Sequence, residues 1–388
     1  MAKSGKKPII ELPVIITLTS EGVDWLRRNK RQPRRVRTAD NRLEYGIALR
    51  NFSAASLQKM INIDYIAAVE IARTGYSEKR TEIIDLTKLI VYRILYRSFE
   101  EETYGLLMNS TLIKRWNRTH PTRIIDETSI FNPAQVEGLL ASCSGELPSV
   151  SEDIQSAVIR DIDADPKLSM EEKEIHRLLC QRFLNSMRNI TWCVLARSRS
   201  QEEYPAMVQR VGALLRGYVS RAKIGEYLAL MVTELLTYTE SLRSFGVARR
   251  LSPRSKAGPE MLRSPKLRAA IAAQLQREED YLYLTYRVIS KGASIGTGNR
   301  LRIVLFNRAE EYRKVKEQVE NKLGLDIKKK SLLEFYRKMP EGELGVELGL
   351  YYLSFLQAEC ARCDVHLESY VSEVPSRDLM VINLMLQL

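Results

Sequence analysis

The chain has 388 residues, a length that predicts two domains, or three, and its 45% of apolar residues is typical of a globular protein with sizeable cores. Its 60 Lys and Arg outnumber its 48 Asp and Glu, and the net charge of +12 favours anionic partners such as nucleic acid. No run of about 18 apolar residues occurs, so we expect no transmembrane segment. The five cysteines form no disulfide framework, which favours a reducing, cytoplasmic setting.

The first part of the chain, residues 1–145, is expected to be a basic domain of mixed helices and strands. Its hydrophobic periodicity predicts one strand and three helices, at residues 8–20, 20–30, 54–74 and 81–106. Ser20 is the expected N-cap of the first helix. The stretch from 110 to 134 contains the turn signals NRTHPTR and FNP and shows little periodicity.

A cluster of positive charge, RRNKRQPRRVR, follows the first predicted helix at residues 27–37. One interpretation is a contact to the phosphate backbone of a nucleic acid, with Trp25 or Tyr45 available for stacking. The alternatives are a solvated loop and a contact to an acidic protein. The candidate anion-binding residues are Arg27, Arg28, Lys30, Arg31, Arg34, Arg35 and Arg37.

The composition changes near residue 145, where Ser, Gly, Pro and acidic residues predict a linker over 146–169. Residues 170–245 read as helices, the last ending near Gly246, and they offer a surface for a homodimer or a protein partner. A basic loop at 249–268 follows. The remaining pattern predicts a hairpin, two helices and a final pair of strands, at residues 279–309, 309–324, 342–363 and 364–388. We therefore expect an α+β fold.

Three segments carry a resemblance to a known family. They are TELLTYTES (233–241) on a predicted helix, LRIVLFNRA (301–309) on a predicted strand, and GELGVELGLYYLSFLQAE (342–359), a glycine-bearing loop that opens a helix. In this order, residues 205–388 resemble the ATP-binding domain of sensor histidine kinases and anti-sigma factor kinases, which is grouped with gyrase and Hsp90 (GHKL). The resemblance implies a two-layer α/β sandwich, preceded here by a helical segment, so that 170–388 would form one domain.

The resemblance also implies an ATP site with Mg²⁺, in which Glu234 would polarise the attacking water. Tyr238 stands where the family has a magnesium-binding Asn, and Asn307 stands where an Asp accepts a hydrogen bond from adenine. Ala309 replaces a glycine of the same motif. The phosphate loop would contain Gly342, Gly345 and Gly349, but Glu343 and Glu347 add negative charge there. These departures favour weak or absent ATP binding.

Two further sets of residues have both a chemical and a structural interpretation. His176 lies on a predicted helix as a candidate phosphate acceptor, but Arg177 follows it where sensor kinases often have an acidic residue, so we favour a partly exposed helix histidine. Cys360, Cys363 and His366 could begin a metal site, but a structural zinc needs four ligands and no second close pair is present. We therefore favour packing of the two cysteines at the end of the helix.

Three functional hypotheses follow. The first is a signalling or regulatory protein whose degenerate, non-catalytic ATPase-like domain acts through protein–protein contacts. The second is a regulator that binds nucleic acid through its basic N-terminal region. The third is an active ATPase or kinase with an atypical magnesium site.

Overall fold

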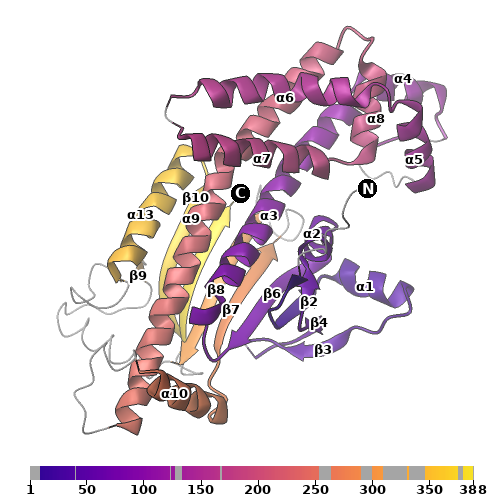
Figure 1. Cartoon of the computed structure of the whole chain (residues 1–388). Coiled ribbons are helices and arrows are strands. Elements are labelled where there is room, and N and C mark those ends of the chain that lie inside the picture. Colours follow the sequence, from indigo (N-terminus) through magenta and orange to yellow (C-terminus); the bar gives the residue numbers. More distant parts are fainter. Residues whose placement is uncertain are drawn as a thin grey trace, which may run out of the picture. The chain divides into compact units, whose positions relative to one another are not determined.

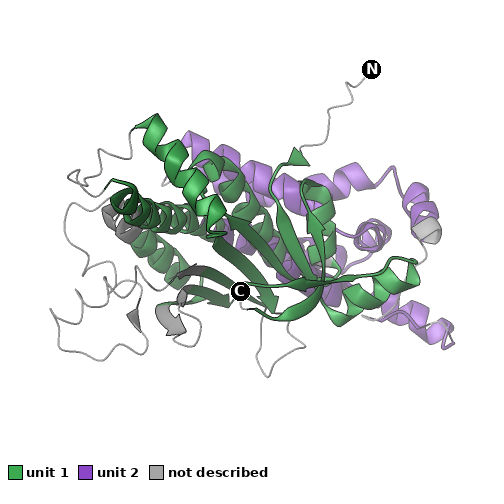
Figure 2. Ribbon diagram, turned by 90° about the horizontal axis from the view of Figure 1, so that it is seen from below, with its two compact units in different colours: residues 1–94, 224–388 green, residues 95–223 purple. Residues whose placement is uncertain are grey.

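A computed structural model describes residues 9–39, 41–122, 124–126, 133–166, 168–252, 264–289, 299–308, 330–331, 346–374 and 379–387 (Figure 1). The protein is α+β, as expected from the sequence. It divides into two compact units, residues 1–94 with 224–388 (unit 1) and residues 95–223 (unit 2), shown in separate colours in Figure 2. These bounds differ from the predicted ones at 145 and 170, because unit 2 is inserted between the two parts of unit 1.

Unit 1 is built on a sheet in which the described strands are antiparallel and follow the order β3-β4-β2-β6-β7-β8-β11-β10-β9. The strands are β2 (Val14–Leu18), β3 (Arg34–Arg37), β4 (Leu43–Leu49), β6 (Ile66–Arg73), β7 (Leu282–Ile289), β8 (Arg300–Arg308), β9 (Lys330–Ser331), β10 (His366–Val374) and β11 (Leu379–Gln387). The short strands β1 (Ile9–Ile10) and β5 (Phe52–Ser53) pair separately. The predicted hairpin at 279–309 and the terminal strand pair are confirmed, but their tips lie outside the described residues.

The two faces of this sheet differ in polarity because successive side chains of a strand point to opposite faces. A row of directly opposed residues crosses the apolar face, namely Ile16, Val69, Tyr286, Ile303 and Leu384. All five are buried. The opposite face is polar, with Glu44 on β4, Glu70 on β6, Thr285 and Arg287 on β7, and Arg302 on β8.

Helices of unit 1 cover the apolar face (Figure 1). They are α1 (Ser20–Arg28), α2 (Ala54–Asn62), the first half of α3 (Arg80–Met108), the second half of α9 (Tyr204–Leu251) and α13 (Val346–Arg362). α10 (Pro265–Arg277) packs against the end of α9. The hydroxyl groups of Thr87 on α3 and Tyr286 on β7 are 2.5 Å apart. The rings of Tyr227 on α9 and Phe355 on α13 stack with centroids 5.5 Å apart. α3, α9 and α13 therefore form one helical layer over the sheet.

Residues 14–73 follow the order β2-α1-β3-β4-β5-α2-β6, and apart from the short β5 their strands lie in the order β6-β2-β4-β3. This is the topology of the split βαβ plait of ferredoxin-like folds. The predicted helix over 54–74 is wrong beyond residue 62, where Asp64, with φ of 57°, follows the helix end and β6 begins at Ile66. β6 is buried between β2 and β7, and a short apolar run of this kind does not distinguish a strand from a helix.

Unit 2 is helical. Besides the adjoining halves of α3 and α9, it contains α4 (Thr111–Thr119), α5 (Pro133–Ser142), α6 (Leu147–Ala164), α7 (Met170–Ser186) and α8 (Asn189–Ser198). Its core includes the ring of Phe183, whose centroid lies 5.4 Å from that of Tyr96 and 5.3 Å from that of Tyr218. Several aromatic side chains are therefore packed against one another in this core.

Two sequence predictions for this region differ from the structure. The expected linker at 146–169 is mostly the helix α6, which buries an apolar residue at every fourth position, namely Val150, Ile154, Val158 and Ile162. The expected break at Gly246 is absent, because α9 continues to Leu251. The helix expected at 309–324 and the turn at Pro375 lie outside the described residues.

Candidate nucleic-acid interface

The seven cations predicted from the sequence lie together at one edge of the sheet of unit 1, and we call this set the basic edge. Arg27 and Arg28 form the last turn of α1, and Lys30 and Arg31 follow it. The other three, Arg34, Arg35 and Arg37, lie on the edge strand β3. All seven are exposed. The structure therefore brings together residues that are spread over helix, turn and strand in the sequence.

The position of α1 on the sheet places its basic last turn at the basic edge. Thr19 rather than Ser20 is the N-cap, since its side chain accepts a hydrogen bond of 3.2 Å from the Gly22 amide. Gly22 lies against the chain before β6, and a Cβ atom on it would lie 2.4 Å from the Tyr65 carbonyl oxygen. A glycine is thus needed for α1 to approach the sheet closely.

The other end of α1 turns sharply toward β3. The Lys30 amide donates to the Arg27 carbonyl at 3.0 Å, and the Arg31 amide donates to the Leu26 carbonyl at 2.9 Å. Lys30 has φ of 57°, the left-handed conformation in which helices commonly end. This turn directs the last turn of α1 and the strand β3 to the same edge.

The charge of the basic edge is largely uncompensated. Arg27 pairs with Asp24 at 3.7 Å, and both side chains are more than half exposed. Within the described residues, the other six cations form no ion pair. The guanidinium carbons of Arg27 and Arg35 lie 5.5 and 5.3 Å from the centroid of the Tyr45 ring. The hydrogen bond and positive charge of Arg35, with the charge of Arg27, lower the pKa of Tyr45.

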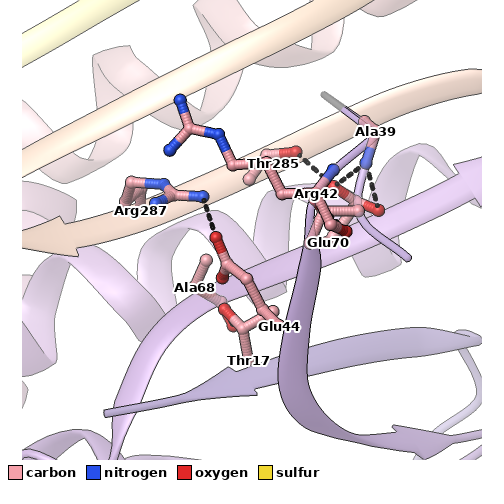
Figure 3. A network of polar contacts seen from close by, with 9 residues as sticks. Thr17, Ala39, Arg42, Glu44, Ala68, Glu70, Thr285 and Arg287 are labelled. Atoms are coloured by element: carbon pink, nitrogen blue, oxygen red, sulfur yellow. Dashed lines mark hydrogen bonds and ion pairs between the residues drawn. The ribbon is translucent and has the colours of Figure 1, made fainter. Parts of the chain in front are cut away.

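A network on the polar face of the sheet supports this edge (Figure 3). Glu70 on β6 is 2% exposed, and its two carboxylate oxygens accept hydrogen bonds from the Ala39 amide at 2.9 and 3.1 Å. The same carboxylate accepts a bond of 3.0 Å from the Thr285 hydroxyl. On β4, which β2 separates from β6, Glu44 pairs with Arg287 at 3.3 Å. The β3–β4 connection is thus tied to the sheet by a buried carboxylate.

A second basic and aromatic surface, on α4 of unit 2, was missed in the sequence. Lys114, Arg115 and Arg118 are exposed, and Trp116 is 41% exposed. The Trp116 ring stacks on His120 with centroids 3.8 Å apart and an angle of 13° between the planes. We call these residues the α4 surface. The sequence KRWNR (114–118) combines basic residues with a tryptophan and could have indicated this surface. The turn residues that follow it obscured the helical pattern.

Glu234, the expected catalytic residue, is in an ion pair. Its carboxylate lies 2.5 Å from Arg80, which also donates to Thr237 at 3.2 Å. Tyr238, one turn further along α9, is buried. Glu240 on the same helix accepts the amides of Tyr76 and Ser77 at 2.6 and 2.9 Å. Glu234 and Glu240 of α9 therefore bind the first residue of α3 and the segment that precedes it.

The other residues of the expected ATP site are only partly described. Asn307 lies on β8 opposite Met380 of β11, and Gly349 lies in the first turn of α13. Gly342 and Gly345 lie outside the described residues. In the described part of unit 1, a cavity of about 10 Å³ lies between α9 and the sheet, lined by Val232, Leu235, Leu236, Leu284, Ile303, Leu305 and Leu384. It is apolar and has room for about one water molecule.

The cysteine and histidine candidates are separate from the basic edge. Cys360 is buried near the end of α13, and burial raises its pKa to about 12. The Nε2 atom of His366 lies 3.3 Å from a carboxylate oxygen of Glu368. No three His, Cys, Asp or Glu side chains in the described ranges are placed to hold a metal ion. His176, the other candidate, is 8% exposed within α7.

No helix in the described parts of the chain is long and apolar enough to cross a membrane. No solved structure matches the chain significantly. An uncharacterized protein of Treponema pallidum (strain Nichols) is 25% identical over 385 residues, which cover 99% of each chain. A family model described as a family of unknown function, DUF8084, matches residues 5–388. The chain, from its basic edge to its last strand, therefore belongs to the DUF8084 family.

Proposed function

We propose that this protein is a regulator that binds single-stranded nucleic acid through the basic edge. The observation that carries the proposal is the gathering of seven exposed cations on one edge, of which one forms an ion pair within the described residues. Concentrated positive charge of this kind attracts the phosphate backbone and releases its counterions on binding. Phosphate contacts would thus supply most of the affinity.

Aromatic rings beside the cations favour a single strand over a duplex. Tyr45 on β4 contacts the guanidinium groups of both Arg27 and Arg35. Trp25 on α1 is 39% exposed, and its ring centroid lies 5.3 Å from that of Tyr65. Unpaired bases stack on rings of this kind, whereas the bases of a duplex are stacked on each other. Backbone contacts with stacking predict binding with little sequence preference.

Fluorescence anisotropy with a labelled single-stranded oligonucleotide and its duplex, over a range of salt concentration, tests the proposal. The variant Arg28→Ala/Arg34→Ala/Arg37→Ala removes three exposed cations that do not contact Tyr45. We expect weaker binding of the single strand and a salt slope reduced by about 2 units, since each phosphate contact contributes roughly 0.7.

The matched control removes the same charge from another surface of unit 1. Lys266, Arg268 and Arg277 are exposed on α10, and the variant Lys266→Ala/Arg268→Ala/Arg277→Ala should bind almost as the natural protein does. Equal losses in the two variants would mean that net charge alone attracts the oligonucleotide. That result, or no binding at low salt, would refute the basic edge as the site.

The finer fold is also proposed: the second part of unit 1 is a degenerate histidine-kinase-like sandwich that serves as a non-catalytic platform. Support comes from the order α9, β7, β8, α13, β10, β11, which follows the order of the family's helix, hairpin, second helix and final strands. Support for the absence of catalysis comes from Glu234, whose carboxylate is paired with Arg80. A carboxylate held in an ion pair is not free to orient an attacking water.

A thermal-shift and calorimetric titration with ATP, with and without Mg²⁺, tests the platform. A ligand that binds the folded state must raise the melting temperature. We expect no shift with millimolar ATP and no turnover in either the natural protein or Glu234→Gln. Micromolar binding, with hydrolysis lost in Glu234→Gln, would instead establish the active enzyme with an atypical magnesium site.

A further inference from the structure

α7 of unit 2 carries an exposed stripe that the proposed function does not use. Ile175 is 39% exposed and Leu178 is 53% exposed, although both are large and apolar. Glu171 precedes them by four and seven residues, and Arg182 follows by seven and four. Residues spaced by three and four lie on one face of a helix. We call Glu171, Ile175, Leu178 and Arg182 the α7 stripe.

The two charged ends of the stripe are open. Within the described residues, neither Glu171 nor Arg182 forms an ion pair, whereas the other acids of the first turns of α7 are engaged. Glu172 pairs with Lys223 at 2.9 Å, and Glu174 pairs with Arg177 at 3.0 Å. A Glu near the start of a helix and an Arg near its end are favoured by the helix dipole. The dipole does not account for the two exposed apolar residues between them.

Along the α7 stripe the residues follow the order acid, apolar, apolar, base. A second copy of the helix that runs in the opposite direction would therefore set its base against the acid, and its apolar residues against the apolar ones. Two copies of α7 packed antiparallel about a two-fold axis would place Ile175 against Leu178 of the second copy. The same register would place Glu171 against Arg182 of the second copy, and this pair would form twice. A two-fold contact requires such a self-complementary patch. The spacing of four, three and four residues is also that of a seam between packed helices.

We propose that the α7 stripe is the contact surface of a homodimer of this protein. The occupant is a second copy, because the charges of the stripe complement those of its own reverse. A single helix pair is smaller than the interface of a stable dimer, so the dimer is a weak one with micromolar affinity. Dimerisation would give each particle two basic edges and would strengthen binding to a long strand.

Sedimentation velocity of the full chain over a wide concentration range tests the dimer. We expect the natural protein to pass from monomer to dimer with rising concentration. Leu178→Glu should remain monomeric, because it places two carboxylates in the apolar centre. The control Leu139→Glu alters another exposed leucine of unit 2, and it should dimerise as the natural protein does.

Charge reversal gives a second test that does not depend on the apolar centre. Glu171→Arg should weaken the dimer, since two pairs of arginines would face each other, and Arg182→Glu should weaken it through facing carboxylates. The double variant Glu171→Arg/Arg182→Glu restores both pairs and should restore the dimer. A monomer at every concentration, or a double variant no better than the single ones, would overturn the proposal. Neither result would affect nucleic-acid binding to a short strand, so the two proposals fail separately.

Discussion

Lys30 is a lysine in a backbone conformation that favours glycine. Its φ of 57° lies in the left-handed region, where the Cβ atom of an L-residue is crowded. Glycine is the usual residue at this position after a helix, since it has no Cβ. The natural residue therefore keeps a charge on the basic edge at a cost in stability.

Lys30→Gly is expected to stabilise the protein by about 1 kcal/mol, because the crowding is removed. It should also weaken oligonucleotide binding slightly, because one cation is lost. Urea unfolding and anisotropy measure the two effects on the same sample. Arg31→Gly is the control: Arg31 is also an exposed cation, but its φ is not positive, so it should lose binding without gaining stability.

Glu172 predicts a pH dependence of stability in unit 2. Hydrogen bonds from Lys223 and from Ser169, which Glu172 completes as a capping box, lower its pKa to about 2. Its charged form is therefore favoured in the folded state. The resulting stability is fully present above the ordinary pKa of 4.5 and is lost as the pH falls toward 2.

Glu172→Gln should accordingly lower the free energy of unfolding by about 0.5 kcal/mol at neutral pH, because Gln can keep the capping-box hydrogen bond but loses the charge that pairs with the partly exposed Lys223. The difference from the natural protein should shrink below pH 4.5. Urea unfolding at several pH values measures it. When Lys223, the first partner of the carboxylate, is replaced in a Lys223→Met background, Glu172→Gln should lower the free energy of unfolding by less. A constant difference at all pH values would contradict the assignment.

Among the secondary-structure elements, the helices of this chain contain glycines with opposite roles. A Cβ on Gly22 of α1 would lie 2.4 Å from a backbone oxygen, which cannot move without shifting β6. A Cβ on Gly212 of α9 would come no closer than 3.9 Å to the atoms of α6. Glycine is thus required at one helical position and is merely tolerated at the other.

Gly22→Ala should destabilise the protein by roughly 1–3 kcal/mol through overpacking. Gly212→Ala should stabilise it by about 0.5–1 kcal/mol, because alanine is the better helix former. Chemical denaturation of the two variants side by side measures both signs. If Gly22→Ala also stabilised the protein, that result would contradict the close packing of α1 against Tyr65.

Long elements with a clear hydrophobic period could be predicted from the sequence. Elements whose burial depends on neighbouring strands or helices could not. α3, α7 and the strands β7, β8, β10 and β11 follow clear periodicity. β6 was mistaken for helix because its apolar character comes from two neighbouring strands, one of which lies more than 200 residues away in the chain. α6 was mistaken for a linker because its polar residues hide a regular row of buried ones.

The candidate site shows the same division. Charge is visible in sequence, so all seven cations of the basic edge could be named in advance. The residues that position them could not, because Glu70 acts through Ala39 and Thr285, which are remote in sequence. Similarly, a motif suggests a role for Glu234, but only the fold reveals that Arg80 neutralises it.

At the scale of the whole molecule, each unit carries one surface that combines cations with an exposed aromatic ring. Unit 1 has the basic edge and unit 2 has the α4 surface. When two sites on one protein bind one strand, the second contact is intramolecular and gains from a high effective concentration. A strand long enough to reach both should bind more tightly than a short one.

Lys114→Ala/Arg115→Ala/Arg118→Ala is therefore expected to weaken binding of a long single strand severalfold and to leave a short strand almost unaffected. Anisotropy with oligonucleotides of increasing length measures this difference, and the α10 variant described above is the control. Equal loss for all lengths would show that the α4 surface is a primary site. No loss for any length would exclude it from binding.

The position of β3 at the end of the sheet has a consequence for solubility. An edge strand exposes unpaired amides and carbonyls, which can pair with another chain and begin aggregation. Three of the four residues of β3 are arginines, and like charges on approaching edges repel each other. A relative that had lost its anionic ligand would still need this charge, because an uncharged edge would invite sheet-to-sheet growth of the folded protein.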